Sequence, residues 1–302
     1  MNKQWPELLY SEAKDTYETL HMWTQIIGKI KLTKQPWINH SWHVTLAVTP
    51  AGLTTGGLMH EDKHFQIDFD LVQHKLKVIT NTRLTRMFDL QGLSVAAFYE
   101  NVVRALNELN ISIDINLIPN EVEKAIPFDK DKVHATYHPK HATALHKALL
   151  NAQAVFTQFR SEFNGKCSPV HFFWGSFDLA VSRFSGREAP MHPGGIPNLP
   201  DRVAREAYSH EVSSCGFWPG NESVPFAAFY SYIYPEPDGY SDSAIGPEEA
   251  YYDSQLGEFI LPYKAVQDAE DPAVKLLEFL RSTYNAAAGL AEWDRSALDV
   301  RY

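Results

Sequence analysis

The chain has 302 residues, 44% hydrophobic and 21% charged, a balance typical of a globular protein with a substantial buried core. Its formal net charge of −10 opposes attraction to nucleic-acid phosphates and anionic lipid, so we expect neither nucleic-acid nor membrane-surface binding. Two cysteines are too few for a disulfide scaffold, and no signal peptide or apolar run of about 20 residues is evident, so the sequence predicts a cytoplasmic protein without a membrane span.

The chain begins with a predicted amphipathic helix. Apolar residues recur at helical spacing from about Ser11 to Leu32. On another face of the same helix His21, Gln25 and Lys29 repeat every four residues. We expect this polar row to face solvent.

Strands and a second helix follow up to about residue 120. Alternating apolar and polar residues predict short antiparallel strands at 42–48, in the two arms of a hairpin over 64–80, at 87–92 and at 111–119. Ser94 can cap a helix that continues to Leu109.

The second part of the chain repeats this order of elements. Pro139 suits the first turn of a long helix that ends near Asn164. Further strands are predicted at 170–184, 207–217, 226–234 and 258–261. Asp271 and Pro272 form the start signal of a closing helix.

These elements predict an α+β fold, with antiparallel sheets in two lobes covered by long amphipathic helices. The lobes would comprise residues 1–120 and 139–302, joined by the polar connection 121–138, with one continuous domain as the alternative. The acidic segment 235–257 is long for a plain connection and predicts an ordered functional loop or a subunit contact.

The stretch 167–220 carries the candidate chemistry, because charged residues interrupt a run typical of a buried strand. If residues 170–184 form one strand, Asp178 points away from Leu179 and Val181 and lies beside small Ser176. Small neighbours around a carboxylate leave room for a ligand. The structural alternative is a buried salt bridge from Asp178 to Arg183 or Arg187.

Two loops after this strand supply further candidates. Residues 192–201 contain three prolines and two glycines, which predict a stiff loop suited to the wall of a pocket, or else a structural crossover. We expect His210 or His192 to transfer a proton, with Asp178 as the orienting partner.

The remaining candidates would contact the substrate. Arg183 or Arg187 would anchor a carboxylate or phosphate, since guanidinium groups bind these anions. Trp174, Ser176 and Glu211 complete the predicted substrate-binding set.

A metal or other cofactor is not assigned by the sequence. His192, His210 and Asp178 together match a divalent-metal pattern of two imidazoles and one carboxylate. Thirteen histidines in one chain make such combinations common by chance, so we expect no metal site and leave the cofactor open. The motifs of P-loop nucleotide hydrolases, Rossmann dehydrogenases, common serine hydrolases and zincin proteases are absent.

Several long strings in order, among them GKCSPVHFFWGSFDLAVSRFSGR and HPGGIPNLP, resemble a bacterial family of unknown function. The resemblance covers almost the whole chain and implies no activity, cofactor or catalytic residue. From the residues we expect an enzyme acting on a small polar or anionic molecule. The alternative is a non-catalytic module that binds a small ligand or assembles as a homodimer.

Overall fold

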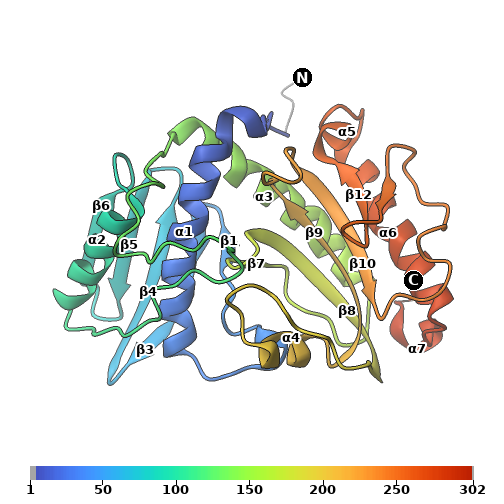
Figure 1. Cartoon of the computed structure of the whole chain (residues 1–302), viewed down its shortest axis with the longest axis horizontal. Coiled ribbons are helices and arrows are strands. Elements are labelled where there is room, and N and C mark those ends of the chain that lie inside the picture. The colour runs from blue at the N-terminus through green and yellow to red at the C-terminus, as the bar shows by residue number, and fades with distance from the viewer. Residues whose placement is uncertain (1–4, 301–302) are drawn as a thin grey trace.

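A computed structural model describes residues 5–300 of the chain, which form two antiparallel sheets of six strands each with helices packed on them (Figure 1). This arrangement confirms the predicted α+β class. Along the described residues the helices are α1 (Tyr10–Lys34), η1 (Asn39–Ser41), α2 (Val95–Asn107), α3 (Pro139–Ser161), α4 (Asp201–Ala207), α5 (Tyr263–Gln267), α6 (Pro272–Leu290) and α7 (Arg295–Leu298).

The first sheet has the strand order β1-β2-β4-β5-β6, with β3 paired to β4, and the second has the order β11-β12-β10-β9-β8-β7. The strands of the first sheet are β1 (Ala47–Thr49), β2 (Gly52–Thr54), β3 (Leu58–His60), β4 (Lys63–Asp70), β5 (Lys75–Thr80) and β6 (Thr85–Asp89). Those of the second are β7 (His171–Phe173), β8 (Asp178–Glu188), β9 (His210–Trp218), β10 (Ala228–Tyr234), β11 (Tyr251–Asp253) and β12 (Glu258–Pro262).

The two sheets meet edge to edge. Leu46, which precedes β1, exchanges both backbone hydrogen bonds with Phe172 of β7, at 2.9 and 2.8 Å. Buried residues from both halves of the chain belong to one hydrophobic cluster, and α1 runs along the junction (Figure 1). The two predicted lobes therefore share a backbone bridge and a core.

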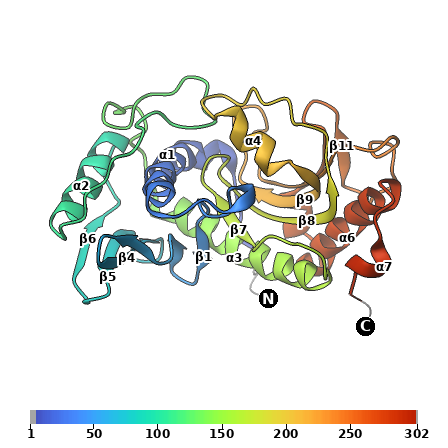
Figure 2. The ribbon, with the colours of Figure 1, turned by 90° about the horizontal axis from the view of Figure 1, so that it is seen from below.

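Helices cover the two sheets unequally. On the first sheet, Trp23 of α1 stacks on Phe98 of α2 at 4.8 Å, and Phe98 stacks on Phe69 of β4. On the second sheet, Phe156 of α3 packs against Phe229 of β10. Figure 2 shows α3 and α6 on one side of β8 and β9, and only the short α4 with its flanking loops on the other. One face of the second sheet therefore has no long helix against it.

The segment 170–184 is a hairpin and not the single strand that we predicted. Phe173 of β7 pairs with Asp178 of β8, and the chain reverses between them through Phe177, whose φ is +60°. Gly175 lies in the same turn. Within β8, Leu179 and Val181 belong to the hydrophobic cluster as predicted, while Asp178 and Ala180 on the other face are also buried.

Two other predicted strands are absent from the described structure. Residues 42–48 form turns after η1, and only the end of this segment enters β1. The burial of residues 111–118 alternates as predicted, yet they form no strand because no neighbouring strand pairs with them. The predicted first helix, the 64–80 hairpin and the helices capped by Ser94 and Asp271 are confirmed.

Candidate functional site

The face of the second sheet that has no long helix against it carries a group of polar side chains. Strand pairing aligns Ala180 of β8 with Gly216 of β9 and Tyr230 of β10, and aligns the next outward residues in the same way. The outward side chains along these rows are Asp178, Ser182, Ser214, Tyr230, Tyr232 and, at the start of β12, Glu258. Asp178 and Ser214 are buried, so loops cover part of this face.

Asp178 is the centre of this face. It is only 6% exposed, and its carboxylate accepts hydrogen bonds from the Ser176 hydroxyl, at 2.5 Å, and from the Tyr230 hydroxyl. Tyr230 reaches Asp178 across β9 because Gly216 has no side chain. A Cβ atom at Gly216 would lie only 2.4 Å from the Tyr230 hydroxyl oxygen. Burial raises the pKa of Asp178, while the two hydroxyl donors act in the opposite direction.

Tyrosine hydroxyls extend the hydrogen bonding along the face. Tyr230 stacks on Tyr232 with ring centroids 6.2 Å apart, and the hydroxyls of Tyr232 and Tyr208 lie 2.8 Å apart. Burial raises the pKa of all three phenols, so they remain protonated donors at neutral pH.

Glu121 brings a second carboxyl group from the connection between the predicted lobes. A Cβ atom at Gly175 would lie only 1.9 Å from the Glu121 Oε1 atom, so the carboxyl group rests directly on the turn that leads to Asp178. The side chain is exposed to water, yet surrounding protein displaces much of its solvation. That desolvation, and then the charge of Asp178, raises the pKa of Glu121 to about 7.

Glu258 is the third carboxyl group. Burial, and to a smaller extent repulsion from Asp178 and Asp253, raises the pKa of Glu258 to about 7. No Lys, Arg or His among the described residues lowers the pKa of Glu121, Asp178 or Glu258. We call the surface formed by Glu121, Ser176, Asp178, Tyr230, Tyr232 and Glu258 the acidic face.

The polar row of α1 positions the two turns that lead to the acidic face, one at Asn120 and one at Gly175. Gln25 is fully buried; its Oε1 accepts from the Asn120 backbone N–H and its Nε2 donates to the Asn120 carbonyl, both at 2.8 Å. His21 Nε2 donates to the Gly175 carbonyl at 2.7 Å, and burial lowers its pKa to about 4, so the ring is neutral. Lys29 is 4% exposed. The predicted solvent exposure of this row is therefore wrong, because loops from distant parts of the chain dock on it.

Four of the predicted site residues, Ser176, Asp178, His192 and His210, lie on this side of the sheet. Asp178 and Ser176 are hydrogen-bonded to each other. His192 lies farther along, where its ring stacks on Tyr208 at 4.7 Å and its Nδ1 accepts from the Gly194 N–H at 3.0 Å.

His210 is far from Asp178. Leu179 pairs with Phe217, so Asp178 lies near the end of β9, whereas His210 begins that strand. At about 3.3 Å per residue the two are roughly 26 Å apart along the strand. His210 lies instead beside His40, with ring centroids 6.1 Å apart. The structure does not assemble the predicted proton-transfer pair.

The predicted arginine anchors have other partners. Arg183 is 2% exposed on the opposite face of the sheet, where its guanidinium lies 3.4 Å from the centroid of the Phe159 ring and 4.3 Å from that of Tyr284. Arg187 forms a salt bridge with Glu211 at 2.7 Å. Neither arginine pairs with Asp178 in the described structure; Arg183 contacts aromatic rings, and Arg187 pairs with Glu211.

Trp174 has a structural role. It is 6% exposed, and its Nε1 donates to the Val44 carbonyl at 2.8 Å. Its ring occupies the space that a side chain at Gly28 of α1 would need. Trp174 therefore locks the β7–β8 turn to α1 and does not contact the acidic face.

Glu121, Glu258 and the tyrosines of the acidic face were not predicted from the sequence. One signal was present: Tyr230, Tyr232 and Tyr234 alternate along β10, which places three phenols on one face of a strand. Glu121 carried no comparable signal, because its position depends on the contact between Asn120 and Gln25.

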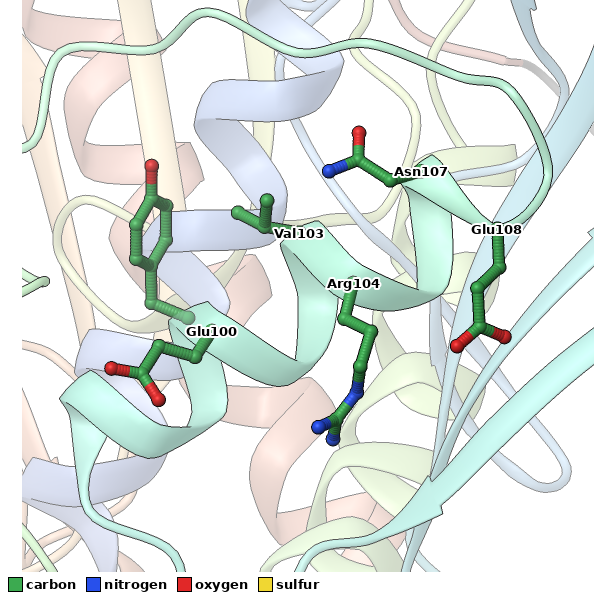
Figure 3. A pocket seen from close by; sticks show the side chains of 6 residues that line it. Glu100, Val103, Arg104, Asn107 and Glu108 are labelled. Carbon is green, nitrogen blue, oxygen red and sulfur yellow. The ribbon is translucent and has the colours of Figure 1, made fainter.

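A hollow of about 570 Å³ lies on the outer surface of α2 (Figure 3). Its lining residues are Tyr99, Glu100, Val103, Arg104, Asn107 and Glu108. They project from a single helix and do not converge on a common point, so we assign no chemistry to this hollow.

Between residues 5 and 300, no group of three or more His, Cys, Asp or Glu side chains is arranged to hold a metal ion. The considered set of His192, His210 and Asp178 is therefore not assembled. None of the described helices is long and apolar enough to cross a membrane.

Comparison with known proteins agrees with the resemblance found in the sequence. Residues 5–300 match the model of a family described as a family of unknown function, DUF5996. No curated protein and no solved structure matches the chain. Because the family model spans nearly all of its length, the chain belongs to the DUF5996 family of unknown function.

Proposed function

We propose that the chain is an enzyme that carries out general acid–base chemistry on a small polar molecule bound at the acidic face. One observation carries this proposal: Glu121, Asp178 and Glu258 share the face without a basic partner among the described residues, and burial raises their pKa values. Carboxyl groups tuned toward neutral pH are typical of catalytic acids and bases.

The three groups differ in the role that their surroundings permit. Glu121 is exposed and has a pKa of about 7, so at neutral pH both of its protonation states are populated and it can exchange a proton with a substrate. Asp178 is buried and accepts from the Tyr230 hydroxyl, which holds that phenol in place. We assign proton transfer to Glu121 and substrate orientation to Asp178 with Tyr230.

The charge of the face favours a neutral or cationic substrate. Three carboxyl groups repel an anion, and Arg183 and Arg187, the expected anion anchors, are engaged elsewhere. Tyrosine rings offer their faces to cationic or apolar parts of a ligand. The anionic substrates considered from the sequence are therefore disfavoured. Cys167 and Cys215 are free thiols, which agrees with a cytoplasmic location.

The proposal is tested by incubating the protein with mixtures of neutral, cationic and anionic metabolites and following them by proton NMR. We expect the wild-type protein to convert a neutral or cationic compound, and Glu121→Gln and Asp178→Asn to lose turnover. Glu123→Gln, at an exposed position two residues from Glu121, is the matched control and should remain active.

Thermal-shift measurements on the same mixtures separate catalysis from binding. A compound that stabilises the wild-type protein without being converted would support the non-catalytic module instead. Turnover that survives both Glu121→Gln and Asp178→Asn would remove the acidic face from the mechanism.

A further inference from the structure

The connection between β8 and β9 is much longer than pairing requires. These strands are antiparallel neighbours, which a loop of about 2–5 residues can join. Here residues 189–209 intervene and include α4. The connection lies on the side of the sheet opposite α3 and α6, as Figure 2 shows.

This connection is held by polar and aromatic contacts and not by the core. None of residues 185–211 belongs to the hydrophobic cluster that unites the two sheets. The Tyr234 hydroxyl donates to the Pro190 carbonyl at 2.9 Å, and His192 stacks on Tyr208. Segments attached in this way open locally at lower free energy than core strands do.

Three hydrogen bonds attach the connection to the turn that carries Glu121. The Glu121 N–H donates to the Pro197 carbonyl at 2.8 Å. The side chain of Asn120 donates to the Asn198 carbonyl at 2.6 Å, and the side chain of Asn198 donates to the Val122 carbonyl at 2.7 Å. We call these three hydrogen bonds the latch.

The segment between the two ends of the connection is internally stiff. Gly194 and Gly195 have φ values of +82° and +84°, and the Gly195 N–H donates to the Asp201 carboxylate at 3.0 Å. Prolines restrict the backbone on both sides, at Pro193 and Pro197. A stiff segment on a polar attachment moves as one body.

We propose that residues 189–200 form a lid beside the acidic face, and that the latch couples opening of the lid to the position of Glu121. The coupling follows from the shared backbone, because Glu121 donates one of the latch hydrogen bonds through its own N–H. Opening the lid therefore frees the turn that places the Glu121 carboxyl group over Gly175. The lid and its coupling to Glu121 do not depend on the proposed function. A role of the lid in substrate entry does rest on it.

Hydrogen exchange followed by mass spectrometry on the full chain tests the lid. Peptides covering 189–200 and 119–123 should exchange at least about tenfold faster than those from β8 and β9. In Asn198→Asp, which removes the donor to Val122 but tolerates the same backbone conformation, both peptides should exchange about fivefold faster than in the wild type. Asn110→Asp is the matched control, since Asn110 has a similar φ of +55° in an exposed turn outside the lid.

Two results would overturn the proposal. Exchange of 189–200 at the rate of β8 and β9 would make the segment an integral part of the fold. Acceleration of only one of the two peptides in Asn198→Asp would show that the latch does not couple them.

Access to the face is measured separately with N-acetylimidazole, which acetylates tyrosine. Labelling of Tyr230 and Tyr232 should be faster in Asn198→Asp than in the wild type and in Asn110→Asp. Equal labelling rates would refute the lid even if turnover is found. Absence of turnover together with the expected exchange and labelling would refute the proposed enzyme and leave the lid standing.

Discussion

Replacing Glu121 by glutamine should stabilise the protein at alkaline pH and leave its stability unchanged at acid pH. In the folded chain the pKa of Glu121 is raised from 4.5 to about 7. Below 4.5 the group is protonated in the folded and the unfolded state, so it contributes no difference. Between 4.5 and 7 the unfolded state loses the proton first, and the free energy of unfolding falls as the pH rises. Above 7 the full penalty is present, and glutamine removes it.

The size of the effect follows from the pKa and from solvent access. A rise from 4.5 to about 7 corresponds to about 3 kcal/mol at most. Glu121 is exposed to water, which screens its charge, so we expect about 1 kcal/mol of added stability in Glu121→Gln above neutral pH. Glutamine keeps the shape of the side chain and the backbone hydrogen bond to Pro197.

Urea unfolding near pH 4, 6 and 8 measures this difference for the wild type, Glu121→Gln and Glu123→Gln. The gain in Glu121→Gln should be absent near pH 4, partial near pH 6 and complete near pH 8. The Glu123→Gln control should follow the wild type throughout. A Glu121→Gln variant that is less stable than the wild type near pH 8 would refute the argument that this carboxyl group is held at a cost.

Two further substitutions probe how the acidic face is built. Gly216→Ala should displace Tyr230 from Asp178, because the new Cβ atom would lie 2.4 Å from the phenol oxygen. In urea unfolding the free energy of unfolding should fall by about 2–3 kcal/mol. At Gly289 a new Cβ atom meets nothing within 4 Å, so equal stability of Gly216→Ala and Gly289→Ala would contradict this prediction. Gln25→Leu should cost about 3 kcal/mol in the same assay, because it leaves the N–H and carbonyl of Asn120 unsatisfied, and a loss below about 1 kcal/mol would show that water replaces the amide.

The long helices could be predicted because their signals are local. Ser94 caps α2 by accepting from the Ala97 N–H, and Asp271 caps α6 in the same manner. Both caps and the apolar stripes behind them lie within a few residues of each other in the sequence. Tertiary context did not need to be known.

The polar row of α1 was mispredicted because its partners are remote. Gln25 and Asn120 are 95 residues apart, and His21 and Gly175 are 154 apart. A helical row of polar side chains has the same spacing whether it faces water or holds a loop. Only the assembled fold distinguishes the two cases.

Only the part of the candidate site that is locally unusual in the sequence could be predicted. Asp178 stood out because a carboxylate in an apolar run is a local anomaly, and it is indeed the buried centre of the acidic face. Arg183 showed the same anomaly, but aromatic rings of α3 and α6 accommodate its charge within the core. Glu121 lies in a polar segment, where another carboxylate attracts no attention.

The turns that carry the carboxyl groups of the acidic face have strained backbone. Glu121, Phe177 and Asn198 all have φ values between +54° and +61°, and each position costs the fold about 1 kcal/mol or more. A carboxyl cluster kept only for structure would be stabilised by a nearby cation and relaxed backbone, because uncompensated buried charge lowers stability. Glu121 and Phe177 lie in the two turns that lead to Glu121 and Asp178, and hydrogen bonds from α1 hold those turns in place, whereas Asn198 lies in the β8–β9 connection. Positive φ also occurs at seven other non-glycine residues of the described chain. Carboxyl groups that lack a basic partner and are held in place by dedicated buried contacts are the feature expected of a binding or catalytic surface.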